Sequence, residues 1–435
     1  MPVAGAPVAT TLADALAPYV GGELPIRLTA WDGSTAGLPD APHVVLYSRT
    51  ALRRILWHPG ELGAAQAYVT GELEVIGDLD DALAHVWAVA AERRLRGVRV
   101  TPRLLLDGVL LARRLGVLGR PPRPPATQAR VRGLLHSRIR DRAAIRHHYD
   151  LSNDFYALIL DEHMAYSSGY WTSDDPGYTL GDAQRDKLDL VCRKLGLHER
   201  PGMRLLDIGC GWGSLSLYAA ERYGTHVVGV TISAEQQRFV ATRVAERGLG
   251  DLVDVRVQDY RDIPDRRFDA VASIEMGEHV GRRTYPEFAK ILHDKTIPGG
   301  RICIQQMSRP ARHHPGGGPF IESFIAPDMY MRPLGATTRL LTEAGLVVDD
   351  VHPLGEHYVR TVDAWYETFE KNWAALVDLV GDEMARVWRL YLVGGRMAFR
   401  DKRMGVDQIT MHRPRGSGRS ATSASSTAPS PAPVR

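Results

Sequence analysis

The stretch Arg204-Leu-Leu-Asp-Ile-Gly-Cys-Gly-Trp-Gly213 decides the fold. An apolar strand is predicted to end at Asp207, and Gly209, Gly211 and Gly213 precede a segment suited to a helix. Glycines let the backbone turn sharply and approach a ligand, and the next helix N-terminus offers oriented N–H groups. The glycine spacing alone is weak evidence, because many nucleotide-binding turns share it. The stretch predicts a strand–turn–helix binding unit whose ligand depends on the neighbouring segments.

Around this turn the sequence alternates between strand and helix patterns. Apolar runs typical of buried strands occupy 203–208, 226–231, 252–258, 268–274 and 299–307. Helical patterns occupy 214–223, 234–247 and 284–294. The order predicts an α/β fold, a doubly wound parallel sheet with helices on both faces.

Composition shifts divide the chain into four expected parts. Residues 1–90 mix short strands with helical stretches and predict a small α+β domain, and 91–140 form a basic amphipathic linker segment. The α/β domain is expected over 141–413, followed by a disordered tail over 414–435 that is rich in Ser, Ala and Pro. Within the α/β domain, the irregular stretch 313–333 is interpreted as a lid or substrate-channel insertion.

Positive charge is concentrated in one segment. Residues 91–147 hold 15 Arg, no Lys and three acidic residues, a net charge of +12, which leaves −9 for the rest of a chain of net charge +3. Such a block binds phosphates of nucleic acid or of anionic lipids. The leucine-rich clusters 104–106 and 109–111 beside the arginines favour lipid. We therefore expect an anionic membrane surface as a partner.

Cysteine usage and hydropathy bear on the compartment. The three cysteines, Cys192, Cys210 and Cys303, have no paired spacing, which favours a reducing setting and argues against a disulfide framework or a metal site. Neither a signal peptide nor a membrane-spanning run is recognised. We expect a cytoplasmic protein that associates peripherally with the inner membrane surface.

Two further segments indicate the ligand of the glycine turn. Val227-Val-Gly-Val-Thr-Ile-Ser-Ala-Glu-Gln-Gln237 and Gln258-Asp-Tyr260 follow it at successive predicted strand ends. Together these segments resemble the S-adenosylmethionine site of class I methyltransferases with a Rossmann-like fold, and in particular that of the cyclopropane fatty acid synthases. The resemblance implies the following cofactor-binding residues: Tyr166, Ser167, Leu205, Leu206, Asp207, Ile208, Gly209, Cys210, Gly211, Gly213, Thr231, Gln236, Asp259 and Tyr260.

The resemblance to this family extends over about residues 40 to 410. It rests on segments spread along the chain: Tyr68–Asp80 of a lipid-associated N-terminal domain, Ile145–Tyr156, Met164–Trp171, Ser273–Gly281, and the helical segments His357–Phe369 and Tyr391–Phe399. It implies added C-terminal helices and an unsaturated phospholipid as substrate. In this family a methyl group is transferred to a cis double bond of an acyl chain, leaving a carbocation that aromatic faces such as that of Tyr166 can stabilise. A bound bicarbonate then removes a proton and the ring closes.

Three departures fall where the family holds its bicarbonate. The resemblance places Ser168 at a family Cys, Gln305 at a family His and Gly395 at a second Cys, whereas Glu278 and Tyr358 match the family. The implied catalytic residues are Glu278, Tyr358, Gln305, Ser168 and Tyr166. A glutamine amide is not a base near neutral pH, which weakens the case for bicarbonate and for ring closure.

A hydride shift followed by loss of a proton would instead give a methylene-branched chain of the 10-methylene stearoyl type. The chain resembles the actinobacterial, tuberculostearic-acid branch of the family, in which a separate downstream reductase completes the 10-methyl product. Phe324-Ile-Ala-Pro-Asp-Met329 and Met404-Gly-Val-Asp-Gln408 carry this resemblance.

Other functions stay open at this point. They are a cyclopropane synthase proper, a methyltransferase of small molecules, and a catalytically silent lipid-binding protein. A nucleic-acid methyltransferase is disfavoured, because the Asn/Asp-Pro-Pro-aromatic motif and a suitably placed catalytic cysteine are missing from the sequence. The oligomeric state is also open, a homo-oligomer included.

Overall fold

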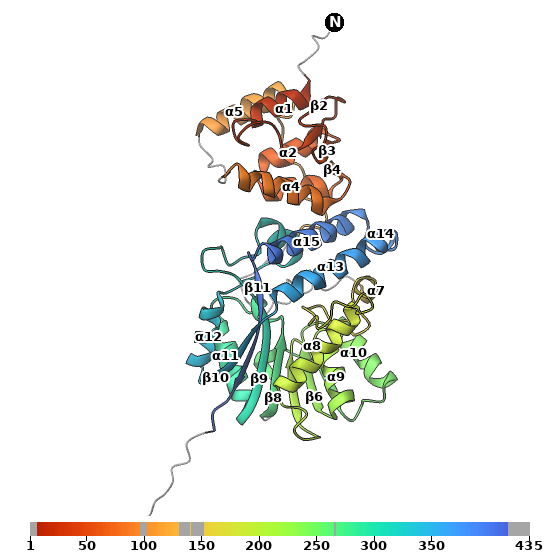
Figure 1. Cartoon of the computed structure of the whole chain (residues 1–435), viewed down its shortest axis with the longest axis vertical. Coiled ribbons are helices and arrows are strands. Elements are labelled where there is room, and N and C mark those ends of the chain that lie inside the picture. The colour runs from red at the N-terminus through yellow and green to blue at the C-terminus, as the bar shows by residue number, and fades with distance from the viewer. Residues whose placement is uncertain (1–6, 96–101, 130–139, 141–151, 265–266, 416–435) are drawn as a thin grey trace, which may run out of the picture.

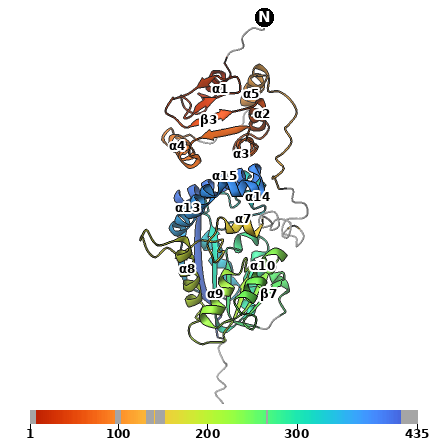
Figure 2. The same ribbon diagram turned by 90° about the vertical axis from the view of Figure 1, so that its right-hand side faces the viewer.

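The computed structural model describes residues 7–95, 102–129, 140, 152–264 and 267–415. The predicted motif Ile145–Tyr156 therefore lies largely outside the described residues, as do parts of the basic segment and nearly all of the predicted tail. Figure 1 shows the N-terminal domain stacked on C-terminal helices, which in turn lie over one end of a large sheet. The view turned by 90° in Figure 2 shows the same order.

The N-terminal domain is a small α+β unit, as predicted. Its sheet has the order β2-β1-β3-β4, formed by Thr35–Ala36, Arg27–Thr29, His43–Leu46 and Leu73–Ile76. Its helices are α1 (Val8–Leu16), α2 (Arg49–Trp57), α3 (Glu61–Val69), α4 (Leu79–Glu92) and α5 (Pro102–Arg114). Ala112 and Leu115 pack into this domain's apolar core, although the sequence assigned them to a separate linker. The N-terminal unit thus extends beyond residue 90 to about residue 117.

A seven-stranded sheet organises the α/β domain in the described part of the chain. Its order is β10-β11-β9-β8-β5-β6-β7, formed by Val347–Pro353, Gly405–His412, Thr296–Ser308, Phe268–Ile274, Arg204–Ile208, His226–Thr231 and Val253–Val257. Neighbouring strands from β9 to β7 are parallel, whereas β11 is antiparallel to both β9 and β10. The parallel strands match their predicted ranges within a few residues. Strands β10 and β11 were not predicted.

Helices cover both faces of this sheet, which confirms the predicted Rossmann-like fold class. One face packs against α8 (Leu180–Lys194), α9 (Ser214–Tyr223) and α10 (Ala234–Glu246). The other face packs against α11 (Tyr285–Lys295) and α12 (Leu334–Glu343). Buried valines, leucines and isoleucines of the strands form both interfaces, as expected for strands covered on two sides.

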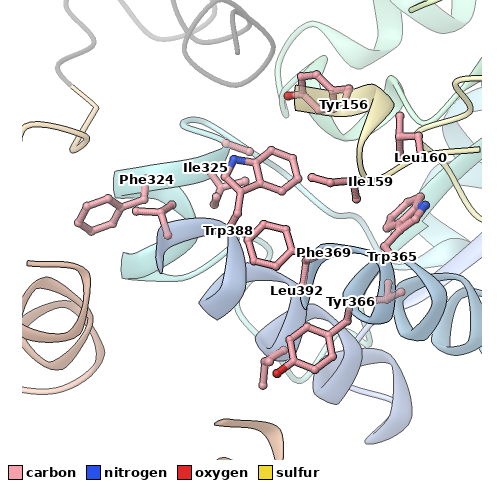
Figure 3. Packing of buried hydrophobic residues seen from close by; sticks show 14 of the residues in the cluster. Tyr156, Ile159, Leu160, Phe324, Ile325, Trp365, Tyr366, Phe369, Trp388 and Leu392 are labelled. Atoms are coloured by element: carbon pink, nitrogen blue, oxygen red, sulfur yellow. The ribbon is translucent and has the colours of Figure 1, made fainter. Parts of the chain in front are cut away.

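The predicted C-terminal helices are α13 (Gly355–Lys371), α14 (Trp373–Val380) and α15 (Asp382–Arg400). They enclose an aromatic core containing Trp365, Phe369 and Trp388, which also includes Tyr156 of the short helix α7 (Asn153–Ala157) (Figure 3). Tyr68 of α3 belongs to the same core, so the N-terminal and α/β domains share buried apolar surface.

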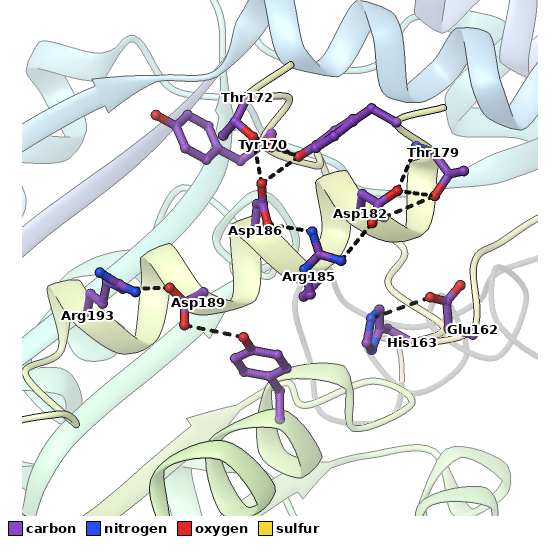
Figure 4. Close-up of polar contacts among 12 residues, drawn as sticks. Glu162, His163, Tyr170, Thr172, Thr179, Asp182, Arg185, Asp186, Asp189 and Arg193 are labelled. Atoms are coloured by element: carbon purple, nitrogen blue, oxygen red, sulfur yellow. Dashed lines mark hydrogen bonds and ion pairs between the residues drawn. The ribbon is translucent and has the colours of Figure 1, made fainter. Parts of the chain in front are cut away.

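Helix α8 presents two different faces. Its outer face carries a polar network that begins with a capping box between Thr179 and Asp182 (Figure 4). On the same face, Asp186 accepts hydrogen bonds from Thr172 and Tyr178 at 2.6 and 2.7 Å. The inner face is apolar apart from a few buried polar side chains, among them Gln184 and Lys187. This helix therefore anchors the preceding loop on one side and reaches the site on the other.

Candidate active site

A pocket of about 160 Å³ opens at the carboxyl ends of the parallel strands. Asp207 and Ile208 come from the end of β5, Thr231 from the end of β6, and Asp259 from the segment after β7. Ligands of doubly wound sheets bind at this edge, where the strand order reverses. The residues of the predicted cofactor site that line the pocket are Tyr166, Ser167, Asp207, Ile208, Gly209, Cys210, Gly211, Thr231, Gln236, Asp259 and Tyr260.

The glycine turn has the backbone that its sequence predicts. Gly209 and Gly211 have φ angles of 76° and 55°, in the region that side chains disfavour. A Cβ atom on Gly209 would lie 2.9 Å from Cγ of Met276. Just before the turn, the buried carboxylate of Asp207 accepts a hydrogen bond from Ser216 at 2.7 Å, and burial raises the pKa of Asp207 to about 6.

Three predicted cofactor residues support the pocket without lining it. Leu205 and Leu206 are fully buried in β5 and pack into the two cores beside the sheet. Gly213 precedes helix α9, and a Cβ atom there would lie 2.8 Å from Cγ1 of Val240. These residues hold the turn against the sheet and the neighbouring helix.

Two charged residues in the pocket were missed by the sequence analysis. Lys187 of α8 is buried, and its Nζ donates a hydrogen bond to Oγ of Ser167 at 3.0 Å. Burial lowers the pKa of Lys187 to about 8. Arg261 donates from two nitrogens to the Asp259 carboxylate at 2.8 and 2.6 Å. Helical periodicity could have placed Lys187 on the inner face of α8, but not against Ser167.

The residues that line the pocket suit S-adenosylmethionine chemically. The glycine turn leaves open space above Gly211, where no atom lies within 4 Å of a built Cβ. Asp207 supplies a carboxylate that suits a cationic ligand, whereas the carboxylate of Asp259 is already paired with Arg261. Thr231 donates to Oε1 of Gln236 at 2.7 Å, so a hydroxyl and an amide stand together where most class I enzymes carry an acid.

A second, largely apolar cavity of about 550 Å³ lies between the N-terminal domain and the C-terminal helices. Its walls come from α3, α4, α13, α15 and the irregular stretch 313–333, which contributes Phe320 and Ile325. Trp87 on α4 lines it and is 58% exposed, so the cavity reaches the surface beside α4. The stretch interpreted as a lid or channel insertion thus forms one wall of an apolar chamber.

The two chambers meet at three side chains. Tyr166, Glu275 and His279 line both the polar pocket and the apolar cavity. A group bound at the glycine turn can therefore face an apolar chain bound in the larger cavity. The chemistry of the site depends on the groups around this junction.

Glu275 is the centre of the hydrogen bonds at the junction. Its Oε1 accepts from the backbone N–H of Ser168 at 2.9 Å and from Nε2 of Gln305 at 2.7 Å. Its Oε2 accepts from the Tyr358 hydroxyl at 2.7 Å. Gln408 Nε2 donates to Oε1 of Gln305 at 2.9 Å, which fixes the orientation of the Gln305 amide. The sequence analysis missed Glu275, although it lies three residues before Glu278 in the quoted motif.

Glu278 lies beside this group in the apolar cavity and is 1% exposed. Burial raises its pKa to about 8, and the nearby charge of Glu275 acts in the same direction. Burial also raises the pKa of Glu275, but three hydrogen bonds and the charge of Lys187 oppose that rise. Of the two carboxyl groups, Glu278 therefore binds a proton more tightly, and the charged form of Glu275 is the better supported by its hydrogen-bond donors.

The other predicted catalytic residues take different positions. Tyr166 and Tyr358 line the apolar cavity, and their rings pack against aromatic neighbours with centroids 5.2 Å from Trp365 and 4.4 Å from Phe399. Gln305 is fully buried behind Glu275. The Ser168 hydroxyl donates to the carbonyl oxygen of Gly169 at 3.0 Å, so only its backbone N–H reaches the junction.

Comparisons with known proteins agree with this geometry. A family model described as mycolic acid cyclopropane synthetase matches residues 136–409. A probable fatty acid methyltransferase of Mycobacterium tuberculosis is 37% identical over 91% of this chain and 93% of its own length. A tuberculostearic acid methyltransferase of the same organism is 34% identical over 90% of this chain and 88% of its own length.

Among solved structures, the mycolic acid cyclopropane synthase CmaA1 complexed with SAH and CTAB has a TM-score of 0.59 and 31% identity. The match covers 62% of this chain and 98% of that protein. Within the described residues, no helix is long and apolar enough to cross a membrane, and no three His, Cys, Asp or Glu side chains are grouped to hold a metal ion.

Proposed function

The chain belongs to the family described as mycolic acid cyclopropane synthetase, and from this premise we propose its substrate and product. It is an S-adenosylmethionine-dependent enzyme that methylates or cyclopropanates lipid acyl chains. The proposed substrate is the cis double bond of an unsaturated acyl chain in a membrane phospholipid. The proposed product is a methylene-branched chain of the 10-methylene stearoyl type.

The observation that carries the proposal is the junction of the two chambers. A long acyl chain needs an apolar cavity, and the larger cavity meets the polar pocket at Tyr166, Glu275 and His279. A double bond held there lies beside the site that holds the methyl donor. The relative CmaA1 was solved in complex with SAH and CTAB, an amphiphile with one long alkyl chain, which supports a long-chain substrate for this protein.

Two cationic side chains in the cavity support a phospholipid rather than a free hydrocarbon. Arg309 and Arg403 line it, and the side chain of Arg403 is 42% exposed. A phosphate attracts arginines through charge-assisted hydrogen bonds. Glu61 also lines this region and partly offsets their charge.

Helix α5 supports docking on an anionic membrane surface. Leu106, Val109 and Leu110 are between 53 and 59% exposed. Arg113 and Arg114 are exposed in the last turn of the same helix. Apolar side chains that enter the lipid boundary beside cations that meet anionic head groups are typical of helices lying in a membrane surface.

The methylene branch is proposed because the chain departs from the family at its base site and resembles a relative named for tuberculostearic acid. The alkene π electrons bond to the methyl carbon, and the bond from that carbon to sulfur breaks and leaves its electron pair on sulfur. A hydride shift then moves the positive charge to the methyl-bearing carbon. Loss of a proton from the new methyl group leaves a methylene branch, a C=CH2 group on the chain. Gln305 cannot serve as the base that a family His could provide. The 34% identity to a tuberculostearic acid methyltransferase also supports this product. A reductase is the class of enzyme that would saturate it.

The test is product analysis with purified protein, dioleoyl phosphatidylglycerol vesicles and S-adenosylmethionine carrying a deuterated methyl group. We expect a labelled acyl chain that takes up hydrogen under mild hydrogenation and becomes methyl-branched. A labelled product that resists mild hydrogenation is a cyclopropane and would overturn the proposed product. Tight binding of S-adenosylmethionine without any labelled lipid would overturn the proposed substrate.

A further inference from the structure

We propose that Glu275 is the catalytic base of this site and that the enzyme therefore works without bicarbonate. The inference rests on the proposed function, because it needs an acyl carbocation that loses a proton. It holds for either product, since both the methylene branch and the cyclopropane ring require removal of one proton from the transferred methyl group.

The position that a bicarbonate would take is already filled by a side chain of this protein. The resemblance places the bicarbonate of the family among Ser168, Gln305 and Tyr358. In this structure all three donate hydrogen bonds to one internal carboxylate, that of Glu275, at 2.7 to 2.9 Å. Donors that would hold a separate anion are thus occupied by a side chain.

Electrostatic repulsion also disfavours a bicarbonate at this position. A bicarbonate bound here would bring a second negative charge next to the Glu275 carboxylate, beside the buried side chain of Glu278. Like charges in a buried site repel strongly, because little solvent screens them. Lys187 is the positive charge that acts on Glu275, and its Nζ is hydrogen-bonded to Ser167. The residues present therefore do not fit a second anion.

The backbone conformation of Glu275 also supports a role for its side chain. Glu275 follows directly after strand β8 and has a φ of 51°, in the left-handed region that glycine favours. Its N–H donates to the carbonyl oxygen of Gln305 at 2.6 Å, which holds this conformation. A residue other than glycine kept in such a conformation at the junction of two chambers indicates that its side chain is needed there.

The proton transfer balances without any further reactant. A C–H bond of the transferred methyl group breaks, and its electron pair forms the new carbon–carbon bond that neutralises the carbocation. The proton moves to the Glu275 carboxylate. Oε1 already accepts two hydrogen bonds, whereas Oε2 accepts one from Tyr358, so Oε2 is the better placed acceptor. Solvent later removes the proton from the carboxyl group.

The decisive measurement compares turnover in buffer freed of carbon dioxide with turnover after bicarbonate is added. We expect the same rate for the unaltered enzyme in both buffers. A rate that falls on depletion and returns with bicarbonate would overturn the inference while leaving the proposed function intact. Absence of lipid methylation in both buffers would instead contradict the proposed function.

Two variants of Glu275 distinguish the loss of its basicity from the loss of its whole side chain. Glu275→Gln keeps the shape but not the basicity, and we expect turnover to fall roughly 100-fold or more with unchanged S-adenosylmethionine affinity. Glu275→Gly leaves the three hydrogen-bond donors without their carboxylate, and glycine adopts a φ of 51° without strain. We expect added bicarbonate or formate to restore part of the turnover of Glu275→Gly. The same anions should not restore the turnover of Glu275→Gln.

The matched control is Glu287→Gln, which removes an exposed carboxylate from the first turn of α11. We expect it to keep the rate of the unaltered enzyme in both buffers. Retention of most turnover by Glu275→Gln, or equal rescue of both Glu275 variants, would contradict the role of Glu275 as the base.

Discussion

Among the single residues, Glu278 makes the stability of the fold depend on pH. Its pKa is raised from 4.5 to about 8 by burial, so the folded state binds this proton more tightly than the unfolded state. The stabilisation is complete below about pH 4.5 and is lost as the pH rises through about 8. Each pH unit in this window removes at most about 1.4 kcal/mol.

We expect Glu278→Gln to reduce the loss of unfolding free energy that occurs as the pH rises. Between about pH 6 and about pH 9, its unfolding free energy should fall less than that of the unaltered protein, by an amount on the order of 1–3 kcal/mol. Urea denaturation followed at several pH values measures the difference. Parallel pH curves for the two proteins would show that Glu278 does not titrate in this window.

Burial raises the pKa of Glu275, and Tyr358 is one of the groups that oppose this rise. Its hydroxyl donates to the Glu275 carboxylate and thereby lowers the pKa of that group. Loss of this hydrogen bond in Tyr358→Phe should raise the pKa of Glu275. The acid limb of the turnover–pH profile should then move to higher pH by about 1 to 2 units.

A control for this profile is Tyr223→Phe, which removes a hydroxyl that donates to Asp189 at 2.5 Å, away from both chambers. It should leave the acid limb where it is. An unchanged acid limb in Tyr358→Phe would mean that another group controls the rate at low pH.

The difference between Glu278 and Glu275 shows how far the sequence can be read at this scale. The resemblance pointed to Glu278, and the structure does place it in the apolar cavity. Glu275 stands out because donors distant in the sequence converge on it: Gln305 lies 30 residues away, Tyr358 83 and Ser168 107. No local pattern predicts that these groups converge.

At the level of elements, parallel strands were predictable and the antiparallel edge was not. Strands such as β5 and β6 are covered on both faces and form apolar runs. Strand β11 is also buried, but it carries the polar residues Asp407, Gln408 and Thr410. Its sequence is therefore not a continuous apolar run, and hydropathy does not predict a buried strand there. Gln408 is buried because it holds Gln305, so the polar residue that obscured the strand also serves the site.

Helix α8 links local stability to the site. Its capping box satisfies backbone N–H groups at the helix start through Thr179 and Asp182 (Figure 4). We expect Thr179→Ala to lower the unfolding free energy by about 1 kcal/mol. Because Lys187 lies two turns further along and is held by the core, the affinity for S-adenosylmethionine should not change. Thermal unfolding and calorimetric titration test the two parts, and a large loss of affinity would show that the cap also positions the site.

For the whole molecule, the apolar cavity depends on how the N-terminal domain sits on α15. Asp80 at the start of α4 accepts from Arg396 at 2.9 Å and lies 3.7 Å from Arg400. We expect Asp80→Asn to destabilise this interface by about 1 kcal/mol, because the half-buried Arg396 loses one of its two carboxylate partners. The KM for phospholipid should rise while the affinity for S-adenosylmethionine stays the same. An unchanged KM would mean that the shared aromatic core alone sets the cavity.

The proposed docking on a membrane places the N-terminal domain against the proposed phospholipid substrate. The cavity reaches the surface beside Trp87, and the exposed residues of α5 belong to the same N-terminal domain. Each basic residue near an anionic surface contributes about 1 kcal/mol, so the double variant Arg113→Glu with Arg114→Glu should weaken vesicle binding at least 10-fold. Sedimentation with phosphatidylglycerol vesicles measures this. The same variant should bind S-adenosylmethionine normally, and its turnover on detergent-dispersed phospholipid should be close to that of the unaltered enzyme. If the variant and the unaltered protein sediment equally with vesicles, α5 is not part of the docking surface. If the variant loses as much turnover in detergent as on vesicles, the two arginines act on the acyl site instead.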